Sequence, residues 1–181
     1  TQGAEKPPKV LNDFELEVPA GQSIAIVGRT GSGKSTIARL LMRFYNIQQG
    51  SISLDGQDIS SVTQASLRSA VALVPDEPFL FSTSVHENIA YGRPGSTRES
   101  VEEAARAAQA HDFIVGLENG YDTIIGERGY DLSGGERQRI SLARLFLQDP
   151  TVVILDDSTS SIDVEIEERI HGSLNKLLRA R

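Results

Sequence analysis

The sequence predicts an α/β fold, because short β-prone runs alternate along the chain with stretches of helical periodicity. Three observations predict this class. A glycine-rich stretch at residues 28–33 stands between a β-prone run and an amphipathic stretch, an apolar run at 152–155 ends in two aspartates, and the region between them is helical in character. The length of 181 residues corresponds to about one domain.

The first part of the chain predicts two strands, a helix and a hairpin turn. Apolar residues alternate with glutamates over 14–18, which predicts a half-buried strand, and 23–27 is a second β-prone run. Residues 52–54 lead into Asp55-Gly56, a dipeptide typical of hairpin turns. The helix after the glycine-rich stretch is marked by Ile37, Leu40, Leu41 and Phe44.

The rest of the chain predicts two buried strands that flank a helical region. Val71–Val74 is an apolar run stopped by Pro75, and Val152–Leu155 is a second one. Between Ser82 and Leu147 the apolar residues fall at helical spacing. A last helix is marked by Ile166, Ile170, Leu174, Leu177 and Leu178.

Composition excludes several classes of protein. The net charge of −7 argues against a general nucleic-acid binder, which needs a basic face to replace phosphate counterions. The absence of cysteine excludes disulfides, thiolate metal sites and cysteine nucleophiles. The longest apolar run, Ala70–Val74, is far shorter than the roughly 20 residues of a membrane helix. We therefore expect any membrane link to run through a partner or through another part of the polypeptide.

Residues 28–35 fit the phosphate-loop pattern G-x-x-x-x-G-K-[ST]. Glycines let successive backbone N–H groups point inward at phosphate oxygens, and the helix that follows adds the positive end of its dipole. Lys34 would place its charge on the outer phosphates, and the Ser35 hydroxyl would ligate magnesium. The alternative is a plain glycine turn. The residues expected to contact the nucleotide are Gly28, Arg29, Thr30, Gly31, Ser32, Gly33, Lys34, Ser35 and Thr36.

Asp156 follows the buried run 152–155, at the carboxyl end of a predicted strand. Ligands of open α/β sheets bind at that edge, and an aspartate there can hold magnesium on the phosphates. By itself an aspartate pair after a strand is often only a helix cap. Together with the loop at Gly28 it predicts a nucleotide–magnesium site.

The segment Leu132–Arg139, with the sequence LSGGERQR, closely resembles the signature sequence of ABC ATPases. Physically it is a second glycine-rich turn at a helix N-terminus and hence a second anion site. The resemblance implies that this turn faces outward and grips the γ-phosphate held by another subunit. The residues implied to contact that partner nucleotide are Ser133, Gly134, Gly135 and Glu136.

The resemblance extends over nearly the whole chain. It implies a RecA-like P-loop NTPase core with a small antiparallel β portion and an inserted α-helical lobe. We expect one ABC nucleotide-binding domain over 1–181, with the core lobe at 1–75 and 150–181 and the helical lobe at about 76–149. The implied cofactors are ATP and Mg²⁺. The implied partners are a second nucleotide-binding domain and an exporter's transmembrane domain, at the cytoplasmic face of a membrane, with no nucleic acid.

Further segments resemble smaller motifs of the family. Val74-Pro75 begins the stretch that matches the Q-loop, and Ser160–Asp163 matches the D-loop at the dimer seam. Gly126–Gly129 resembles the short segment that in exporters touches the intracellular helices of the membrane domain, and Asn88–Gly92 is also typical of exporters. These two segments are less specific to the family than the nucleotide motifs.

The chain also departs from the family pattern. Asp157 stands where a catalytic glutamate is usual, and Asp76 stands where the Q-loop glutamine is usual. No aromatic residue precedes Phe14, so the adenine-stacking aromatic has no candidate. The chain ends at Arg181, before the part in which the switch histidine is expected. We interpret the three histidines present as ordinary solvated residues: His86, His111 and His171.

These departures predict slow hydrolysis at the chain's own site, where Asp157 and Lys34 would be catalytic. Aspartate is nearly as basic as glutamate, but its carboxylate sits back by about 1.5 Å, and a misplacement of about 1 Å can cost 10²-fold. Asp76 lacks the amide donors of glutamine, although it can still ligate magnesium. Because Ser133–Glu136 is intact, the pattern is typical of the weak-site member of a heterodimer. The alternative is a nucleotide-gated interaction module that binds ATP without turnover.

Overall fold

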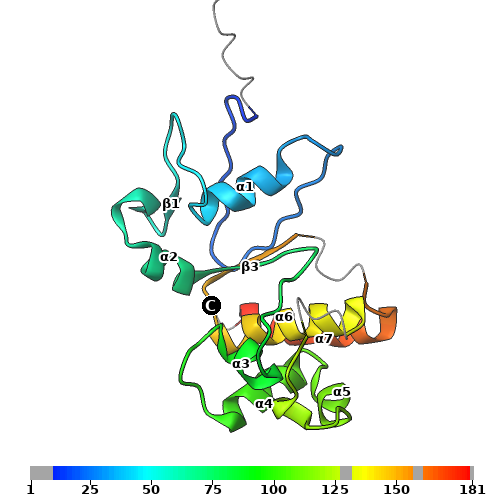
Figure 1. The fold of residues 1–181 in the computed structure, drawn as a ribbon. Helices are drawn as coiled ribbons and strands as arrows, with labels where there is room; N and C mark the ends of the chain where they lie inside the picture. Colours follow the sequence, from blue (N-terminus) through cyan, green and yellow to red (C-terminus); the bar gives the residue numbers. More distant parts are fainter. Residues whose placement is uncertain (1–9, 127–131, 157–160, 180–181) are drawn as a thin grey trace, which may run out of the picture. The chain divides into compact units, whose positions relative to one another are not determined.

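The computed structural model describes residues 10–126, 132–156 and 161–179 (Figure 1). It divides into two compact units, Thr1–Val62 and Thr63–Arg181. We call them the first and the second unit and describe each by itself. This division differs from the predicted lobes, whose boundaries at 75/76 and 149/150 stay a prediction.

The first unit contains helix α1 (Lys34–Leu41), strands β1 (Ser53–Leu54) and β2 (Gln57–Asp58), and a 3₁₀ turn η1 (Ile59–Ser61). The hairpin is antiparallel, and its turn residues Asp55 and Gly56 both have positive φ, 49° and 77°. This backbone is the type that Asp-Gly adopts readily, which confirms the predicted turn. Arg43 joins the end of α1 to η1, because its Nη1 donates to the carbonyl oxygens of Ile59 and Val62 at 2.9 and 2.7 Å.

Both strands predicted before the phosphate loop are wrong for this structure. Residues 14–18 and 23–27 form no strand, and Phe14, Leu16 and Val18 are 50%, 46% and 47% exposed. The physical reason is pairing: an extended segment becomes a strand only when a neighbour receives its backbone hydrogen bonds. Within the described part of the first unit, the only paired strands are β1 and β2.

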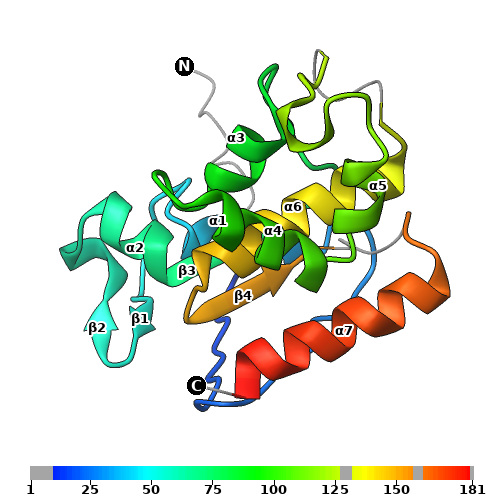
Figure 2. The ribbon, with the colours of Figure 1, turned by 90° about the horizontal axis from the view of Figure 1, so that it is seen from below.

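The second unit begins with helix α2 (Gln64–Ala70), which leads into β3 (Val71–Val74). β3 pairs in parallel with β4 (Val152–Leu155), with Val71 opposite Val152 and Val74 opposite Leu155 (Figure 2). Both strands were predicted from their apolar runs, and their parallel pairing agrees with the α/β class. The last predicted helix is α7 (Val164–Arg179), whose Ile170 and Leu174 are buried.

The chain between the two strands is helical, as predicted. It forms α3 (Val85–Ala90), α4 (Arg98–Ala107), α5 (His111–Val115), the 3₁₀ turn η2 (Gly120–Asp122) and α6 (Gly134–Gln148). Figure 1 shows α6 between the β3–β4 pair and α3, α4 and α5. The centre of α6 is accordingly apolar and fully buried, with Ile140, Leu142 and Ala143 at 0% exposure. Among the described residues, no helix is long and apolar enough to cross a bilayer.

Candidate functional site

The phosphate loop lies in the first unit and ends where α1 begins, at Lys34, as the sequence predicts. Gly31 and Gly33 have φ of +81° and +97°, a backbone conformation that disfavours residues with a Cβ. The ammonium of Lys34 turns back over the start of the loop, where Nζ donates to the carbonyl oxygens of Gly28 and Arg29 at 2.8 and 3.1 Å. A positive charge is thereby held at the mouth of a loop that leads into a helix N-terminus, which suits an anion.

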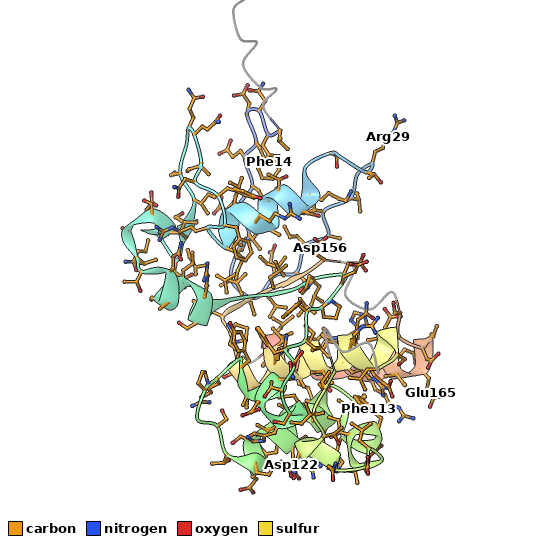
Figure 3. The ribbon with its side chains drawn as sticks, in the orientation of Figure 1. Phe14, Arg29, Phe113, Asp122, Asp156 and Glu165 are labelled. Carbon is orange, nitrogen blue, oxygen red and sulfur yellow. The ribbon has the colours of Figure 1, made fainter. Side chains whose placement is uncertain are left out.

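Two glycines of this loop lie close to neighbouring side chains. A Cβ on Gly28 would lie 2.7 Å from Ser32 Oγ, and one on Gly33 would lie 3.0 Å from Leu11 Cδ2. A backbone turn closes the loop, since Ser32 N donates to the Arg29 carbonyl at 3.1 Å. The Arg29 side chain points outward from the loop (Figure 3). The tight curl is therefore a property of the loop itself.

Two of the predicted magnesium ligands lie at the same edge of the sheet in the second unit. Parallel strands end at the same edge, and Asp76 follows β3 there as Asp156 follows β4. Figure 3 labels Asp156. Asp156 N donates to the Val74 carbonyl at 3.0 Å, so the pairing continues to this aspartate. Among the described residues, no three His, Cys, Asp or Glu side chains form a metal-binding group. Asp157 lies outside the described residues, so its predicted role stays a prediction.

The signature segment forms the N-terminal turn of α6. Ser133 is the N-cap, its Oγ accepting a hydrogen bond from Glu136 N at 3.3 Å, while Ser133 N donates to Glu136 Oε2 at 2.7 Å. This reciprocal capping box fixes the entry of the chain into the helix. A cleft of about 350 Å³ opens there, lined by Ser133, Gly134, Gly135, Arg139, Ser161, Ile162, Asp163 and Ile166.

Gln138, one turn into α6, links three segments of the second unit. Its side chain is buried, at 2% exposure. Nε2 donates to the Asp76 carbonyl at 3.2 Å, and Oε1 accepts from Ser161 N at 3.2 Å. One amide thus connects the end of β3, the signature helix and the segment that resembles the D-loop.

Arg139 lies on the wall of the cleft. Its Nη1 donates to the Gln109 carbonyl at 2.8 Å, and its guanidinium lies 4.6 Å from the centre of the Phe113 ring. Burial lowers the pKa of Arg139, while the carboxylates of Glu136 and Asp163 oppose that shift. The side chain therefore ties the cleft to helix α5 and brings a cation to its wall.

A second arginine, Arg144, organises an aromatic cluster at the other end of α6. Its guanidinium donates to the Phe79 carbonyl and to both the carbonyl and the side-chain oxygen of Asn88, each at 2.6 Å. Burial lowers the pKa of Arg144 to about 10. Three rings lie beside it and are exposed: Phe79 at 53%, Phe81 at 36% and Tyr91 at 63%. Phe81 contacts Phe79 at 5.1 Å and Tyr91 at 4.6 Å between ring centres, so the rings form one patch.

The interpretation of the histidines as solvated holds only for His171, which is exposed. His111 is half-buried, and its Nδ1 lies 2.9 Å from the hydroxyl of Tyr121. His86 is half-buried, and its Nδ1 has no hydrogen-bond partner in the described part of the chain. The sequence interpretation was wrong for these two, and at His111 the reason is a contact with Tyr121, ten residues away, that no local pattern predicts.

Gln138 and Arg144 were missed as functional candidates. For Arg144 the available signal was a charged residue between the apolar residues Ala143 and Leu145, which indicates a buried side chain with partners. Gln138 gave no such signal, because its neighbours Arg137 and Arg139 are charged. The pattern could not name those partners, because they come from distant segments. The aromatic patch was missed for the same reason, although Tyr91 belongs to a segment singled out in the sequence.

Comparison with known proteins decides the family. The model of the ABC transporter family matches residues 11–160. The chain belongs to the ABC transporter family. This domain is 51% identical over 180 residues to the ATP-dependent lipid A-core flippase of Salmonella typhimurium, covering 99% of the chain and 31% of that protein. It is 50% identical over 173 residues to ATP-binding cassette sub-family B member 6 of Xenopus tropicalis, covering 96% of the chain and 20% of that protein.

A solved structure places this ABC domain with exporters. A bacterial Atm1-family ABC exporter, determined with ATP bound, matches with a TM-score of 0.93 at 46% identity, covering 99% of this chain and 32% of that one. The fold is therefore that of an ABC ATPase, a P-loop NTPase, of exporter type. The chain covers only a small part of each relative, from 14% of ABC transporter B family member 14 of Arabidopsis thaliana to 32% of the exporter structure.

ABC domains bind ATP, generally with Mg²⁺, and the residues present fit both groups. In the first unit, the glycine loop holds Gly31 and Gly33 at positive φ and carries the ammonium of Lys34, as a polyphosphate site requires. In the second unit, carboxylates stand at the strand ends, and carboxylate oxygens are ligands that Mg²⁺ prefers. ATP hydrolysis is the activity that membership of the family implies.

Proposed function

We propose that this domain is the ATP-binding motor of an exporter, which pairs head to tail with a second nucleotide-binding domain around ATP and Mg²⁺ to drive transport across a membrane. One observation carries the proposal. The signature turn Ser133–Glu136 is held by its own capping box and opens into a cleft of the second unit, whereas the phosphate loop belongs to the first unit. A preformed anion site of this kind suits a phosphate supplied by another molecule.

The residues of the phosphate loop bind and orient the triphosphate. Backbone N–H groups of the loop and of the first turn of α1 point at its oxygens, and Lys34 neutralises charge on the outer phosphates. When bound, Mg²⁺ supplies a Lewis acid that polarises the terminal phosphate. Ser35, Asp76 and Asp156 would hold it, and Asp157 would orient the attacking water.

The domain's own pocket is proposed to hydrolyse slowly, as the weak-site member of a heterodimer. Asp157 has a shorter reach than glutamate, and Asp76 offers an acceptor-only carboxylate where an amide is usual. The signature turn is intact, so the fast pocket would be the one to which this chain lends Ser133–Glu136.

The aromatic patch of Phe79, Phe81 and Tyr91 supports docking to a membrane-spanning part. Three neighbouring exposed rings on a domain of this size mark a contact surface. Arg144 donates to the carbonyls of Phe79 and Asn88, which anchors the backbone on either side of Phe81. The domain would then lie at the cytoplasmic face of a membrane. Of the two exporter-like segments, Asn88–Gly92 carries part of this patch, and residues 127–129 lie outside the described residues.

A second candidate is a nucleotide-gated interaction module that binds ATP and does not turn it over. Asp76 and Asp157 favour it, because both weaken the hydrolytic half of the domain's own pocket. The two candidates differ in a single observable, which is phosphate release by the assembled transporter.

Phosphate release from the transporter in lipid vesicles, with its partner domain present, tests both proposals. Lys34→Ala should reduce the binding of a fluorescent ATP analogue at this domain more than tenfold. Lys176→Ala, at an exposed position on α7, is the matched control and should bind as the wild type does. Undiminished affinity in Lys34→Ala would overturn the loop assignment. ATP binding without any phosphate release from the assembled pair would favour the interaction module.

A further inference from the structure

Gln138 uses both ends of its side-chain amide at once, and the two ends hold different parts of the domain. The donor end binds the carbonyl oxygen of Asp76, just beyond the end of β3. The acceptor end binds the backbone N–H of Ser161, which lines the signature cleft. The side chain is 2% exposed, so water does not compete for these bonds.

Ser161 is held from two sides by α6. Its N–H is bound by Gln138, and its carbonyl oxygen lies so close to Gly135 that a Cβ there would come within 2.8 Å. Gly134 lies four residues before Gln138 and hence on the same face of the helix. A shift of the Gln138 side chain therefore moves Ser161 against the glycines of the signature turn.

We propose that Gln138 is a positioning residue that couples the two half-sites of this domain. It links the backbone of Asp76, a proposed magnesium ligand beyond the end of β3, to the cleft of Ser133, Gly135 and Ser161 that the domain offers to its partner. The inference rests on the proposed function. When nucleotide and magnesium bind, a displacement of the Asp76 backbone is transmitted through the Gln138 amide to the cleft where the partner's phosphate docks.

The chemistry of an amide explains why glutamine stands here. Two backbone groups of opposite kind, one acceptor and one donor, face the same side chain, and a neutral amide satisfies both. Glutamate at this position keeps the acceptor toward Ser161 and loses the donor toward Asp76. Methionine has nearly the same length and shape and satisfies neither, so the pair of substitutions separates the two bonds.

The test compares Gln138→Glu and Gln138→Met with the wild-type transporter in vesicles, its partner domain and membrane part included. A matched control is Gln148→Met on the same helix, because Gln148 Nε2 makes one bond of the same kind, to the Arg68 carbonyl at 2.7 Å, away from the cleft. Three quantities are measured: steady-state kcat, the Kd of this domain for a fluorescent ATP analogue, and the melting temperature.

We expect kcat to fall at least tenfold in Gln138→Met and less in Gln138→Glu, while Kd changes less than twofold in both. Gln148→Met, which removes one bond of a partly exposed amide, should lower the melting temperature less and keep kcat within twofold. Equal kcat values in Gln138→Met and Gln148→Met would overturn the proposal. The proposal would also be overturned if ATP-analogue binding and kcat were lost together, in proportion to the fall in melting temperature. If Gln138→Met does not fold, Gln138→Glu is judged by the same criteria.

The Ser133→Arg variant separates this inference from the function on which it rests. Turnover that is insensitive to Ser133→Arg would overturn the proposed function itself. Turnover that is sensitive to Ser133→Arg, together with Gln138 variants that match Gln148→Met, would overturn only the coupling role.

Discussion

The guanidinium of Arg144 and the side chain of Asn88 are locked together across 56 residues of sequence. Arg144 Nη2 donates to Asn88 Oδ1 and Arg144 Nε donates to the Asn88 carbonyl, both at 2.6 Å. Asn88 is fully buried, and its Nδ2 donates to the carbonyls of Phe81 and Ser84 at 2.9 and 3.1 Å. The pair therefore joins α6 to α3 and to the segment that carries the aromatic patch.

Arg144→Met should lower the free energy of unfolding by about 2–4 kcal/mol, because it leaves three oxygen acceptors without their donor. Chemical denaturation followed by circular dichroism measures the change. Arg68→Met, at an exposed position on α2, is the control. A loss below about 0.5 kcal/mol would show that the network contributes little to stability.

Ser133→Arg should abolish turnover by the assembled pair, because it places a bulky cation where the partner's γ-phosphate docks. Ser133→Ala tests the cap alone and should cost about 1 kcal/mol of stability. Ser84→Ala is the matched control, since Ser84 forms the same capping box on α3. Steady-state ATPase activity is measured for all three. Unchanged turnover in Ser133→Arg would mean that the signature turn does not serve a partner.

Asp157→Glu should raise hydrolysis at this domain's own pocket, because the longer side chain restores reach of about 1.5 Å. Asp76→Gln should raise it further by returning amide donors. Single-turnover hydrolysis, with the partner's phosphate-loop lysine removed, isolates this pocket. If Asp76→Gln alone restored the rate, the weak site would be real and Asp76, rather than Asp157, would be its cause.

Tyr121→Phe should change how stability depends on pH above 10. Burial raises the pKa of Tyr121 to about 12, above its ordinary value of 10.0. The neutral phenol is thus favoured in the folded state, and this stabilising contribution is complete below pH 10 and is lost as pH rises from 10 to 12. The wild type should therefore lose stability more steeply than Tyr121→Phe in that window.

Arg144 titrates in the same range with the opposite sign. Its pKa is lowered to about 10, so the cost of burying its charge is relieved as pH rises. Because Arg144 is present in both proteins, the difference between their unfolding free energies isolates Tyr121. Parallel stability curves between pH 10 and 12 would contradict the assignment.

The sequence by itself determined the features that depend on neighbouring residues. The positive φ angles at Asp55 and Gly56, the start of α1 at Lys34 and the capping box of Ser133 with Glu136 all follow from contacts within about four residues. The apolar runs that predicted β3 and β4 are also local patterns, and each strand ends at the residue where its run ends. These local patterns were enough to predict the class and the motifs of the site.

Only the tertiary structure decided which distant groups meet. Gln138 binds a carbonyl 62 residues away, and no local pattern states which backbone atoms will face a buried amide. The same reason explains the errors at 14–18 and 23–27. Alternation of apolar residues predicts a strand only if a neighbouring strand accepts its hydrogen bonds, and pairing is a property of the folded chain. His111 follows the same rule, since its half-buried ring meets the hydroxyl of Tyr121, ten residues away.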